Sequence, residues 1–253
     1  MKRAYTLSLF LIIFGAIIAQ PKLDVDIING SISSNPKYYT EYQSKLYFQA
    51  SDGKNGRELW EYDGKSTPSM TADIYTGSNS NSSNPSEFCV FNNKLYFSAT
   101  EGTDGYELWE YDGKNSPKQV KDIYSGSASS LPKDMVVFKG KMYFSAKDSA
   151  HGYEFWSLDS SNNVTLVSDI YKGTSGSYSS QYIIYNDTLF FKADDGSNGD
   201  ELWAYAGSGS PFMVANIASG SNYSLPGFFA VMNGCLYFSA SASSTYGREL
   251  YKY

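Results

Sequence analysis

The sequence predicts an all-β protein, a five-bladed β-propeller of four-stranded antiparallel blades. The first reason is a phrase that occurs five times, a glutamate followed by Leu or Phe and then by Trp or Tyr. Its members are Glu58 and Trp60, Glu107 and Trp109, Glu154 and Trp156, Glu201 and Trp203, and Glu249 and Tyr251. The glutamates are 49, 47, 47 and 48 residues apart, and a fixed period of this size indicates a repeat architecture. The second reason is that each period holds four short aromatic and β-branched runs separated by turn residues, which is the pattern of successive hairpins.

The second repeat shows the expected strands most clearly. They are 87–91, 94–99, 106–111 and 117–123. In the second of these, Leu95, Phe97 and Ala99 share one sheet face, and Tyr96 lies on the other. A sheet that is apolar on both faces must be covered on both, as in radially arranged blades.

The two ends of the chain predict how the ring closes. A fourth run ends in Ile74, Ile123, Ile170 and Ile217 in the first four repeats, but the fifth repeat reaches Tyr253 directly after its third run. Residues 23–27 have the sequence of such a fourth run. We therefore expect this N-terminal strand to complete the last blade and to close the ring. Residues 20–253 then form one domain of five repeats, and an open solenoid is the alternative.

Residues 1–19 have the pattern of a secretory signal peptide. Lys2 and Arg3 form a basic start, residues 7–18 are apolar, and Ala19 offers a small residue for cleavage. The apolar run is shorter than the ~20 residues that a membrane-spanning helix needs. We expect a secreted, extracellular protein with no transmembrane segment.

Charge and cysteine content limit the partners. The formal net charge is −6 and the basic residues are scattered, so nucleic acid is not an expected partner. The two cysteines invite a disulfide in a secreted protein, but Cys89 and Cys235 fall in the second and fifth repeats, which are not neighbours in a ring of five. We expect them to be small apolar residues. Sequons that permit N-glycosylation occur at Asn29, Asn81, Asn163, Asn186 and Asn222.

The recurring text LYFSA-x-DG-x-x-G-x-ELW-x-YDG, followed by DI-x-x-G-S-x-S-S, resembles the ELWxxDGT-repeat family of secreted and cell-surface proteins. The resemblance covers residues 20–253 and implies extracellular repeats without a defined reaction. The sequence departs from the family pattern at Phe155 and Tyr251, and Lys65 and Lys114 replace the usual threonine after Asp-Gly. Repeat length and number are also similar to those of five-bladed lectins of the tachylectin type, which is an analogy of architecture alone.

Few residues favour catalysis. The chain has one histidine, His151, in a loop, and it contains no G-x-S-x-G, H-E-x-x-H or C-x-x-C motif. The repeated glutamates could be imagined as the carboxylate pair of a glycosidase, but the symmetry of the repeat separates them, so we expect them to bind loop N–H groups or neighbouring blades. The Asp-Gly pairs are expected in turns. Calcium binding there is a weak alternative because the spacing matches no EF-hand, and no cofactor or metal is expected.

Two sets of loops are expected on one side of the ring, namely those after each second strand and those after each fourth strand. They are rich in Ser, Gly, Asn, Asp and Tyr, a composition that suits recognition of a ligand, although soluble connections have a similar composition. The candidate ligand-binding residues in these loops are Tyr75, Asp104, Tyr124, His151, Tyr171, Asn198 and Tyr223.

The leading hypothesis is a secreted, non-catalytic binding or adhesion protein. Its pseudo-equivalent loops suit multivalent carbohydrate recognition, in which weak sites gain avidity together. The alternative is a structural protein of an extracellular matrix or coat whose blades bind other proteins. A propeller glycosidase is a third hypothesis, which the five similar repeats disfavour.

Overall fold

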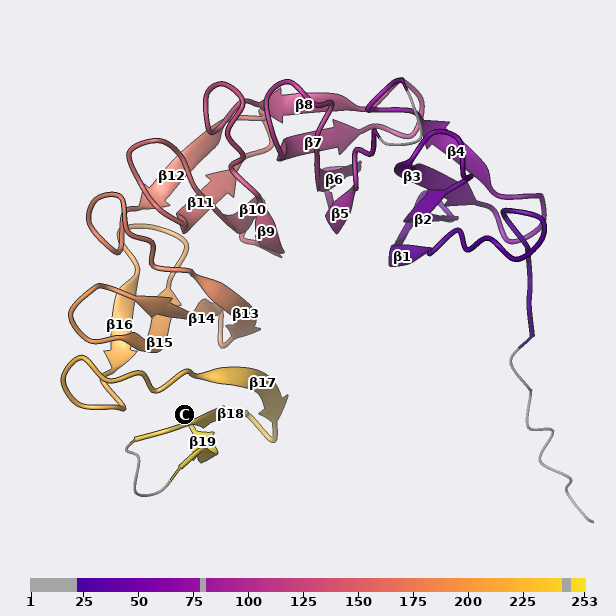
Figure 1. The fold of residues 1–253 in the computed structure, drawn as a ribbon. Coiled ribbons are helices and arrows are strands. Elements are labelled where there is room, and N and C mark those ends of the chain that lie inside the picture. The colour runs from indigo at the N-terminus through magenta and orange to yellow at the C-terminus, as the bar shows by residue number, and fades with distance from the viewer. Residues whose placement is uncertain (1–21, 78–80, 243–246) are drawn as a thin grey trace, which may run out of the picture.

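The computed structural model describes residues 22–77, 81–242 and 247–253 and shows an all-β chain (Figure 1). The predicted signal peptide, residues 1–19, lies outside the described residues. Five antiparallel sheets follow one another in sequence order, four with four strands and the last with three. The all-β prediction is confirmed, and the sheets coincide with the five sequence repeats.

Each sheet is built from strands that are consecutive in the chain. The first two sheets contain β1 (Lys37–Tyr42), β2 (Lys45–Ser51), β3 (Arg57–Tyr62), β4 (Ser69–Ala72), β5 (Ser86–Phe91), β6 (Lys94–Ala99), β7 (Glu107–Tyr111) and β8 (Lys118–Lys121). The next two contain β9 (Lys133–Phe138), β10 (Lys141–Ala146), β11 (Glu154–Leu158), β12 (Val164–Ser168), β13 (Ser180–Tyr185), β14 (Thr188–Asp194), β15 (Asp200–Tyr205) and β16 (Phe212–Ala215). The last contains β17 (Gly227–Met232), β18 (Cys235–Ala240) and β19 (Glu249–Lys252).

A two-residue turn joins the first and second strands of every sheet. In the second sheet its residues are Asn92 and Asn93, with φ angles of 47° and 56°. Two successive positive φ angles are the signature of a type I′ turn, whose twist matches that of the strands it joins. The asparagines tolerate this conformation better than most residues, so the local sequence fixes the register of the hairpin.

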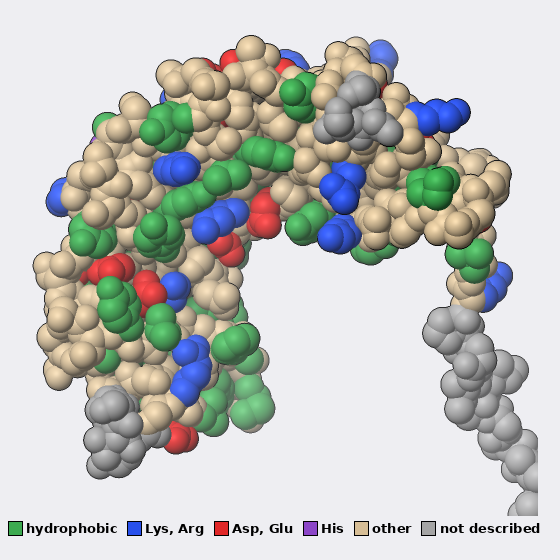
Figure 2. Space-filling model, viewed as in Figure 1, with side chains coloured by type: hydrophobic (Ala, Val, Ile, Leu, Met, Phe, Trp, Pro, Cys, Tyr) green, Lys and Arg blue, Asp and Glu red, His purple; other side chains and the backbone are tan. Residues whose placement is uncertain are grey.

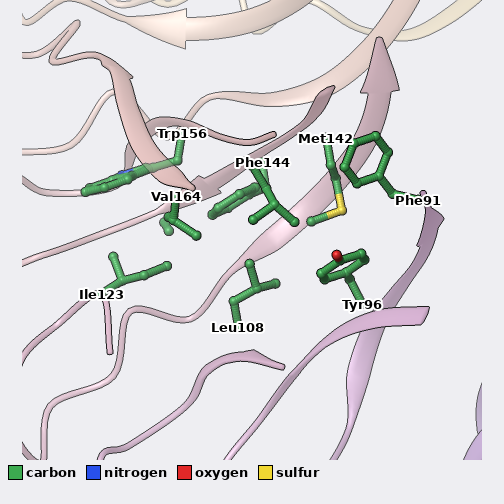
Figure 3. Packing of buried hydrophobic residues seen from close by; sticks show 10 residues of the cluster. Phe91, Tyr96, Leu108, Ile123, Met142, Phe144, Trp156 and Val164 are labelled. Atoms are coloured by element: carbon green, nitrogen blue, oxygen red, sulfur yellow. The ribbon is translucent and has the colours of Figure 1, made fainter. Parts of the chain in front are cut away.

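Apolar side chains from adjacent sheets meet face to face. Figure 3 shows one such seam, where Leu108 and Tyr96 of the second sheet pack against Met142 and Phe144 of the third. All four side chains are fully buried. Burying an aliphatic side chain of this size contributes about 1.5–3 kcal/mol, so each seam is a substantial hydrophobic core. Both faces of the second sheet are therefore covered, as the sequence pattern predicts.

The sheets are arranged along an arc (Figure 1). The first strands of neighbouring sheets, β1, β5, β9, β13 and β17, contact one another in succession along its concave edge. The fourth strands lie on the outer side. This radial order is the one expected for the blades of a propeller.

The predicted pairing of the N-terminal segment with the last sheet is not seen in the structure. Residues 23–27 form no strand, and they lie against the first sheet, where Ile27 packs on Phe48 and Trp60. The Tyr62 hydroxyl donates a hydrogen bond of 2.6 Å to Asp24.

The last sheet consequently keeps one apolar face exposed. Leu250 on β19 is 76% exposed, whereas its counterparts in the first two sheets, Leu59 and Leu108, are completely buried. Those two leucines are covered by the sheet that follows in the chain. The exposed face of the last sheet is thus an apolar surface of the kind that a further sheet covers elsewhere in the molecule.

No helix among the described residues is long and apolar enough to cross a membrane. Cys89 and Cys235 are free thiols.

Candidate functional site

The glutamate of the repeated phrase is buried at each of the first four positions. Glu154 illustrates its contacts: its carboxylate accepts hydrogen bonds from the Ile170 N–H at 2.8 Å and from the N–H and hydroxyl of Ser177 at 2.9 and 2.7 Å. Ile170 lies at the start of the connection that leaves β12, and Ser177 lies just before the next sheet, so this carboxylate ties one sheet to the following one. We call Glu58, Glu107, Glu154 and Glu201 the seam glutamates.

The seam glutamates have structural contacts, because their carboxylates bind the connections between sheets. All four are fully buried. Burial raises the pKa of each carboxyl, and hydrogen bonds from the serine and the isoleucine amide oppose that rise. Each side chain lies in its own seam, so no two seam glutamates lie side by side. The fifth member, Glu249, is exposed.

Two of the loop tyrosines proposed from the sequence pack on glycine. A Cβ placed on Gly102 would lie 2.1 Å from the ring of Tyr75, and one on Gly196 would lie 2.6 Å from the ring of Tyr171. Both glycines have positive φ angles. Tyr75 and Tyr171 are therefore half-buried parts of the loop structure.

Two further predicted residues are folded back onto an aspartate of their own loop. The amide and ring of His151 contact Asp148, with the backbone N–H at 2.7 Å and Nδ1 at 2.9 Å from Oδ1. Asn198 donates from its backbone and its side chain to Asp195, both at 2.8 Å. Burial raises the pKa of Asp148, but hydrogen bonds from His151 outweigh it and the net pKa is lowered. These contacts close turns.

The other predicted residues are dispersed. The Asp104 backbone N–H donates to Glu101 at 3.1 Å, the ring of Tyr124 lies 5.9 Å from the Lys147 ammonium, and Tyr223 is 58% exposed. The seven predicted positions are spread over four seams. Tyr75 packs on the loop that carries Asp104, Tyr171 packs on the loop that carries Asn198, and Tyr124 lies near Lys147 in the loop of His151. The structure does not bring all seven together into one site.

A cavity lies further inward, where the first strands of the first three sheets begin. It measures about 520 Å³ and we call it the concave pocket. It is lined by Lys37, Tyr38, Gln49, Arg57, Asn84, Ser86, Glu87, Ser98, Tyr106, Leu131, Pro132, Lys133 and Tyr153. Figure 2 shows basic, acidic and apolar side chains interleaved along the concave edge of the arc.

Three basic side chains line the concave pocket, and none forms an ion pair within the part of the chain that the structure describes. They are Lys37, Arg57 and Lys133. The Lys133 ammonium lies 4.4 Å from the centroid of the Tyr153 ring, a cation–π distance that holds the charge over the aromatic face.

One acidic side chain lines the same cavity. Glu87 accepts a hydrogen bond of 3.0 Å from the backbone N–H of Asp134. Burial raises the pKa of Asp134, and the nearby Glu87 charge raises it further. Glu87 therefore lies at the boundary between the second sheet and the third, which also supplies Lys133.

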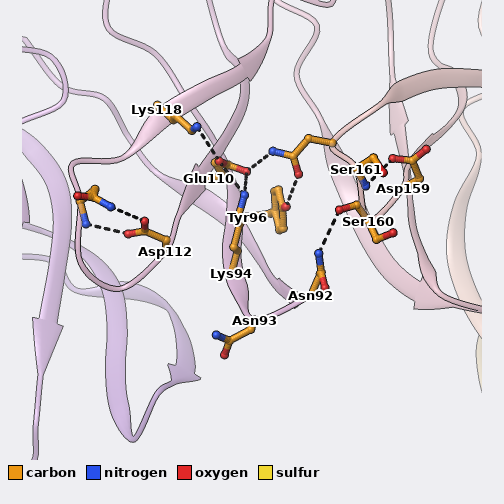
Figure 4. Close-up of polar contacts among 12 residues, drawn as sticks. Asn92, Asn93, Lys94, Tyr96, Glu110, Asp112, Lys118, Asp159, Ser160 and Ser161 are labelled. Atoms are coloured by element: carbon orange, nitrogen blue, oxygen red, sulfur yellow. Dashed lines mark hydrogen bonds and ion pairs between the residues drawn. The ribbon is translucent and has the colours of Figure 1, made fainter.

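A second polar cluster, around Glu110, is different because its charges are matched. Its carboxylate accepts from Lys94 at 2.9 and 3.0 Å and from Asn162 at 2.6 Å, and Lys118 pairs with it at 3.3 Å (Figure 4). The Asn162 amide oxygen in turn accepts from the Tyr96 hydroxyl at 2.9 Å. Because its charged and polar groups bind one another, this cluster stabilises the seam between the second and third sheets.

The concave pocket is built from repeat positions whose residue changes from sheet to sheet. The residue before the seam glutamate is Arg57, Tyr106 or Tyr153 in the first three sheets. The second position of the first strand is Tyr38, Glu87, Asp134, Gln181 or Phe228, always with a φ angle between 55° and 60°. This conformation recurs in all five sheets, at the point where the first strand pairs irregularly with the second, so it belongs to the repeat.

The sequence does not single out the residues of the concave pocket. The concave pocket adjoins the loops after the second strands, because Arg57, Tyr106 and Tyr153 follow them directly. Comparing the repeats for positions that differ in charge would have indicated these residues. The left-handed backbone at the start of the first strand has no comparable sequence signal.

The residues available for a metal are few. Within residues 22–77, 81–242 and 247–253, no group of three or more His, Cys, Asp and Glu side chains is arranged to hold a metal ion.

Comparison with known proteins informs the fold. No protein-family model matches the sequence, and no curated protein matches it significantly. Among solved structures, a puromycin hydrolase is similar with a TM-score of 0.52 and 9% identity over 85% of this chain, and a prolyl endopeptidase with 0.52 and 11% over 87%. This chain spans only 36% and 33% of those two proteins. A putative gluconolactonase has a TM-score of 0.49 and 14% identity, covering 81% of this chain and 71% of its own. The first two likenesses show a propeller-like all-β fold and nothing about activity.

Proposed function

We propose that this chain is a secreted, non-catalytic binding protein that holds a carbohydrate in the concave pocket. The observation that carries the proposal is one open cavity that combines an exposed aromatic ring with amide and charged groups. Tyr38, which is 48% exposed, supplies the ring. A sugar presents an apolar ring face and several hydroxyls, so it is suited to stacking together with hydrogen bonding.

Two amide side chains support the hydrogen-bonding part. The Gln49 amide nitrogen donates to the Pro85 carbonyl at 3.2 Å, and the Asn84 amide nitrogen donates to the Tyr106 hydroxyl at 2.8 Å. These bonds orient both amides and leave their oxygens without a donor among the described residues. Oriented acceptors of this kind can receive hydroxyl protons from a sugar.

A glycan array followed by calorimetry on the purified secreted chain tests this proposal. We expect Tyr38→Ala to weaken binding about tenfold, which corresponds to about 1.4 kcal/mol. Tyr223→Ala is the matched control, because Tyr223 is similarly exposed at 58% but does not line the concave pocket, and it should bind as the unmodified chain does. Binding that Tyr223→Ala abolishes and Tyr38→Ala spares would place the ligand in the outer loops instead.

The proposal includes a closed ring of five blades, in which residues 23–27 pair with β19. Two observations support closure. Leu250 exposes an apolar surface that is covered in the other sheets, and Ile27 already packs on the first sheet as Ile74 packs on the second. Rotation of the arc ends toward each other would bury both surfaces and remove the free sheet edge.

A further inference from the structure

The charge of the concave pocket is opposite to that of the whole molecule. The chain has a formal net charge of −6, whereas the cavity is lined by three basic side chains and one acidic one. Some basic residues elsewhere are paired with acids: Lys45 pairs with Glu61 at 2.6 Å and Lys192 pairs with Asp200 at 2.9 Å. Three cations gathered around one cavity of an acidic protein create a local attraction for anions.

The three cations also have complementary geometry. Arg57 carries a planar fork of donors that can bind a carboxylate or sulfate in a bidentate manner. Lys37 lies on β1 of the same sheet, and Lys133 comes from the third sheet, where its ammonium lies over the Tyr153 ring. The cations thus come from the first and third sheets, and Tyr38 lines the same cavity.

We infer that the concave pocket recognises an acidic sugar residue, whose anionic group is bound by Arg57, Lys37 and Lys133. This inference rests on the proposed carbohydrate binding and specifies the class of ligand. Carboxylate and sulfate share the required chemistry. Glu87 lies on β5, between the strands that carry Lys37 and Lys133, and its carboxylate can accept hydroxyl hydrogens of the same sugar.

Calorimetry with matched ligands tests the inference. The ligands are uronic-acid hexasaccharides, their methyl esters, which keep the rings but lack the charge, and sulfated galactan hexasaccharides. We expect the free acids to bind at least tenfold more tightly than the esters, with affinity falling as sodium chloride is raised. Arg57→Gln should remove this preference, and Lys65→Gln, a change to an exposed lysine outside the cavity, should not.

The outcomes separate the two proposals. Equal binding of acids and esters overturns the acidic-sugar inference and leaves carbohydrate binding intact. Binding of polyglutamate with no binding of any saccharide overturns the carbohydrate function and retains the anion site. Tighter binding of the sulfated ligand than of the uronate identifies sulfate as the preferred group, and binding of none of these ligands overturns both proposals.

A second inference comes from the ends of the arc and concerns Glu249. In the second, third and fourth seams, the isoleucine and the serine that donate to a seam glutamate are seven residues apart, as Ile170 and Ser177 are. Ile27 and Ser34 have the same spacing. The Ser34 carbonyl accepts from the Ser51 N–H at 3.0 Å, as the Ser177 carbonyl accepts from Asp194 at 3.0 Å.

Ser34 therefore occupies the position of the seam serines, but its partner carboxylate is not in place. The only repeat glutamate that is exposed is Glu249. The geometry points to a closing latch in which the Glu249 carboxylate accepts hydrogen bonds from the Ile27 N–H and from the N–H and hydroxyl of Ser34. This inference depends on ring closure and specifies the contacts that secure it.

Urea denaturation of the secreted chain tests the latch. We expect Glu249→Gln and Ser34→Ala each to raise the unfolding equilibrium constant at least tenfold, with the double variant no worse than the more harmful single one. Glu41→Gln, a change at an exposed glutamate on β1, is the control. Effects within twofold of the unmodified chain overturn the latch. If the destabilisation by these substitutions disappears when the protein is diluted, and analytical ultracentrifugation finds a dimer, the contact joins two copies. That result would overturn closure within one chain.

Discussion

The seam glutamates allow a quantitative prediction, for which we choose Glu154→Gln. The substitution preserves size and leaves one acceptor oxygen, but it places an NH2 group where the second carboxylate oxygen was. Four donors reach the carboxylate in the structure: the N–H groups of Ile170, Tyr171 and Ser177 at 2.8, 3.2 and 2.9 Å, and the Ser177 hydroxyl at 2.7 Å. After the change, two of them face another donor.

The expected loss follows from these contacts. A hydrogen bond to a charged group contributes about 1.5–3 kcal/mol, and two are lost. Part of that loss is offset because a buried charge is removed, so we expect the free energy of unfolding to fall by about 2–4 kcal/mol. For a chain of this size that lowers the melting temperature by roughly 10 °C.

The measurement is urea denaturation followed by tryptophan fluorescence, since Trp156 lies on the same strand. Glu41→Gln should change stability by less than about 0.5 kcal/mol because the side chain is exposed. A loss below about 1 kcal/mol for Glu154→Gln, with an unchanged denaturant slope, would refute the view that this carboxylate ties sheets together.

Three further predictions concern other features. Burial raises the pKa of each seam glutamate above 4.5. The stability that these groups contribute is therefore complete below pH 4.5 and is lost as the pH rises through the raised pKa. Thermal melts between pH 4.5 and 8 should show this decline in stability, and Glu154→Gln should make the decline shallower. Gly105→Ala should destabilise the protein by more than about 2 kcal/mol, because φ is +74° and the new Cβ would lie 2.5 Å from the Ala128 carbonyl oxygen. Gly126→Ala, where the new Cβ meets open space, should cost only the backbone strain of about 1 kcal/mol. Equal losses of stability in thermal melts would contradict this prediction. A thiol assay in denaturant without reductant should find two free thiols per chain, and in the native protein Cys89, whose pKa burial raises to about 11, should react more slowly than Cys235; a single or absent thiol signal would indicate a disulfide.

The sheets could be predicted because their signals are local. The alternation of Leu95, Tyr96 and Phe97 specifies two apolar faces, and the Asn92-Asn93 pair specifies a tight turn, so four strands in each of the first four repeats follow from short stretches of sequence. The burial of Tyr96 and Phe97 in separate seams agrees with this pattern.

The concave pocket could not be predicted in the same way. Its cations come from two sheets, and Lys37 and Lys133 become neighbours of one cavity only through the curvature of the arc. Tyr38 itself has a left-handed backbone conformation, in the part of β1 that pairs irregularly with β2. The loop tyrosines, by contrast, are conspicuous in the sequence, yet Tyr75 packs against Gly102 as part of the loop structure. Long-range geometry, not residue type, decides which polar groups share a cavity.

The separation along the chain of the groups that form each seam has a kinetic consequence. A seam glutamate meets donors only 16 to 25 residues further on, so each sheet can dock on the next soon after both have formed. Such contacts are local and favour rapid folding that spreads from neighbour to neighbour.

The Glu249 latch would be the exception, since it joins residues more than two hundred positions apart. By the logarithmic dependence of loop entropy on length, closing it costs about 2 kcal/mol more than closing an ordinary seam. The ring would therefore assemble as a spreading array and close in a separate last step, and opening at this one seam would be the first event when the folded chain begins to unfold.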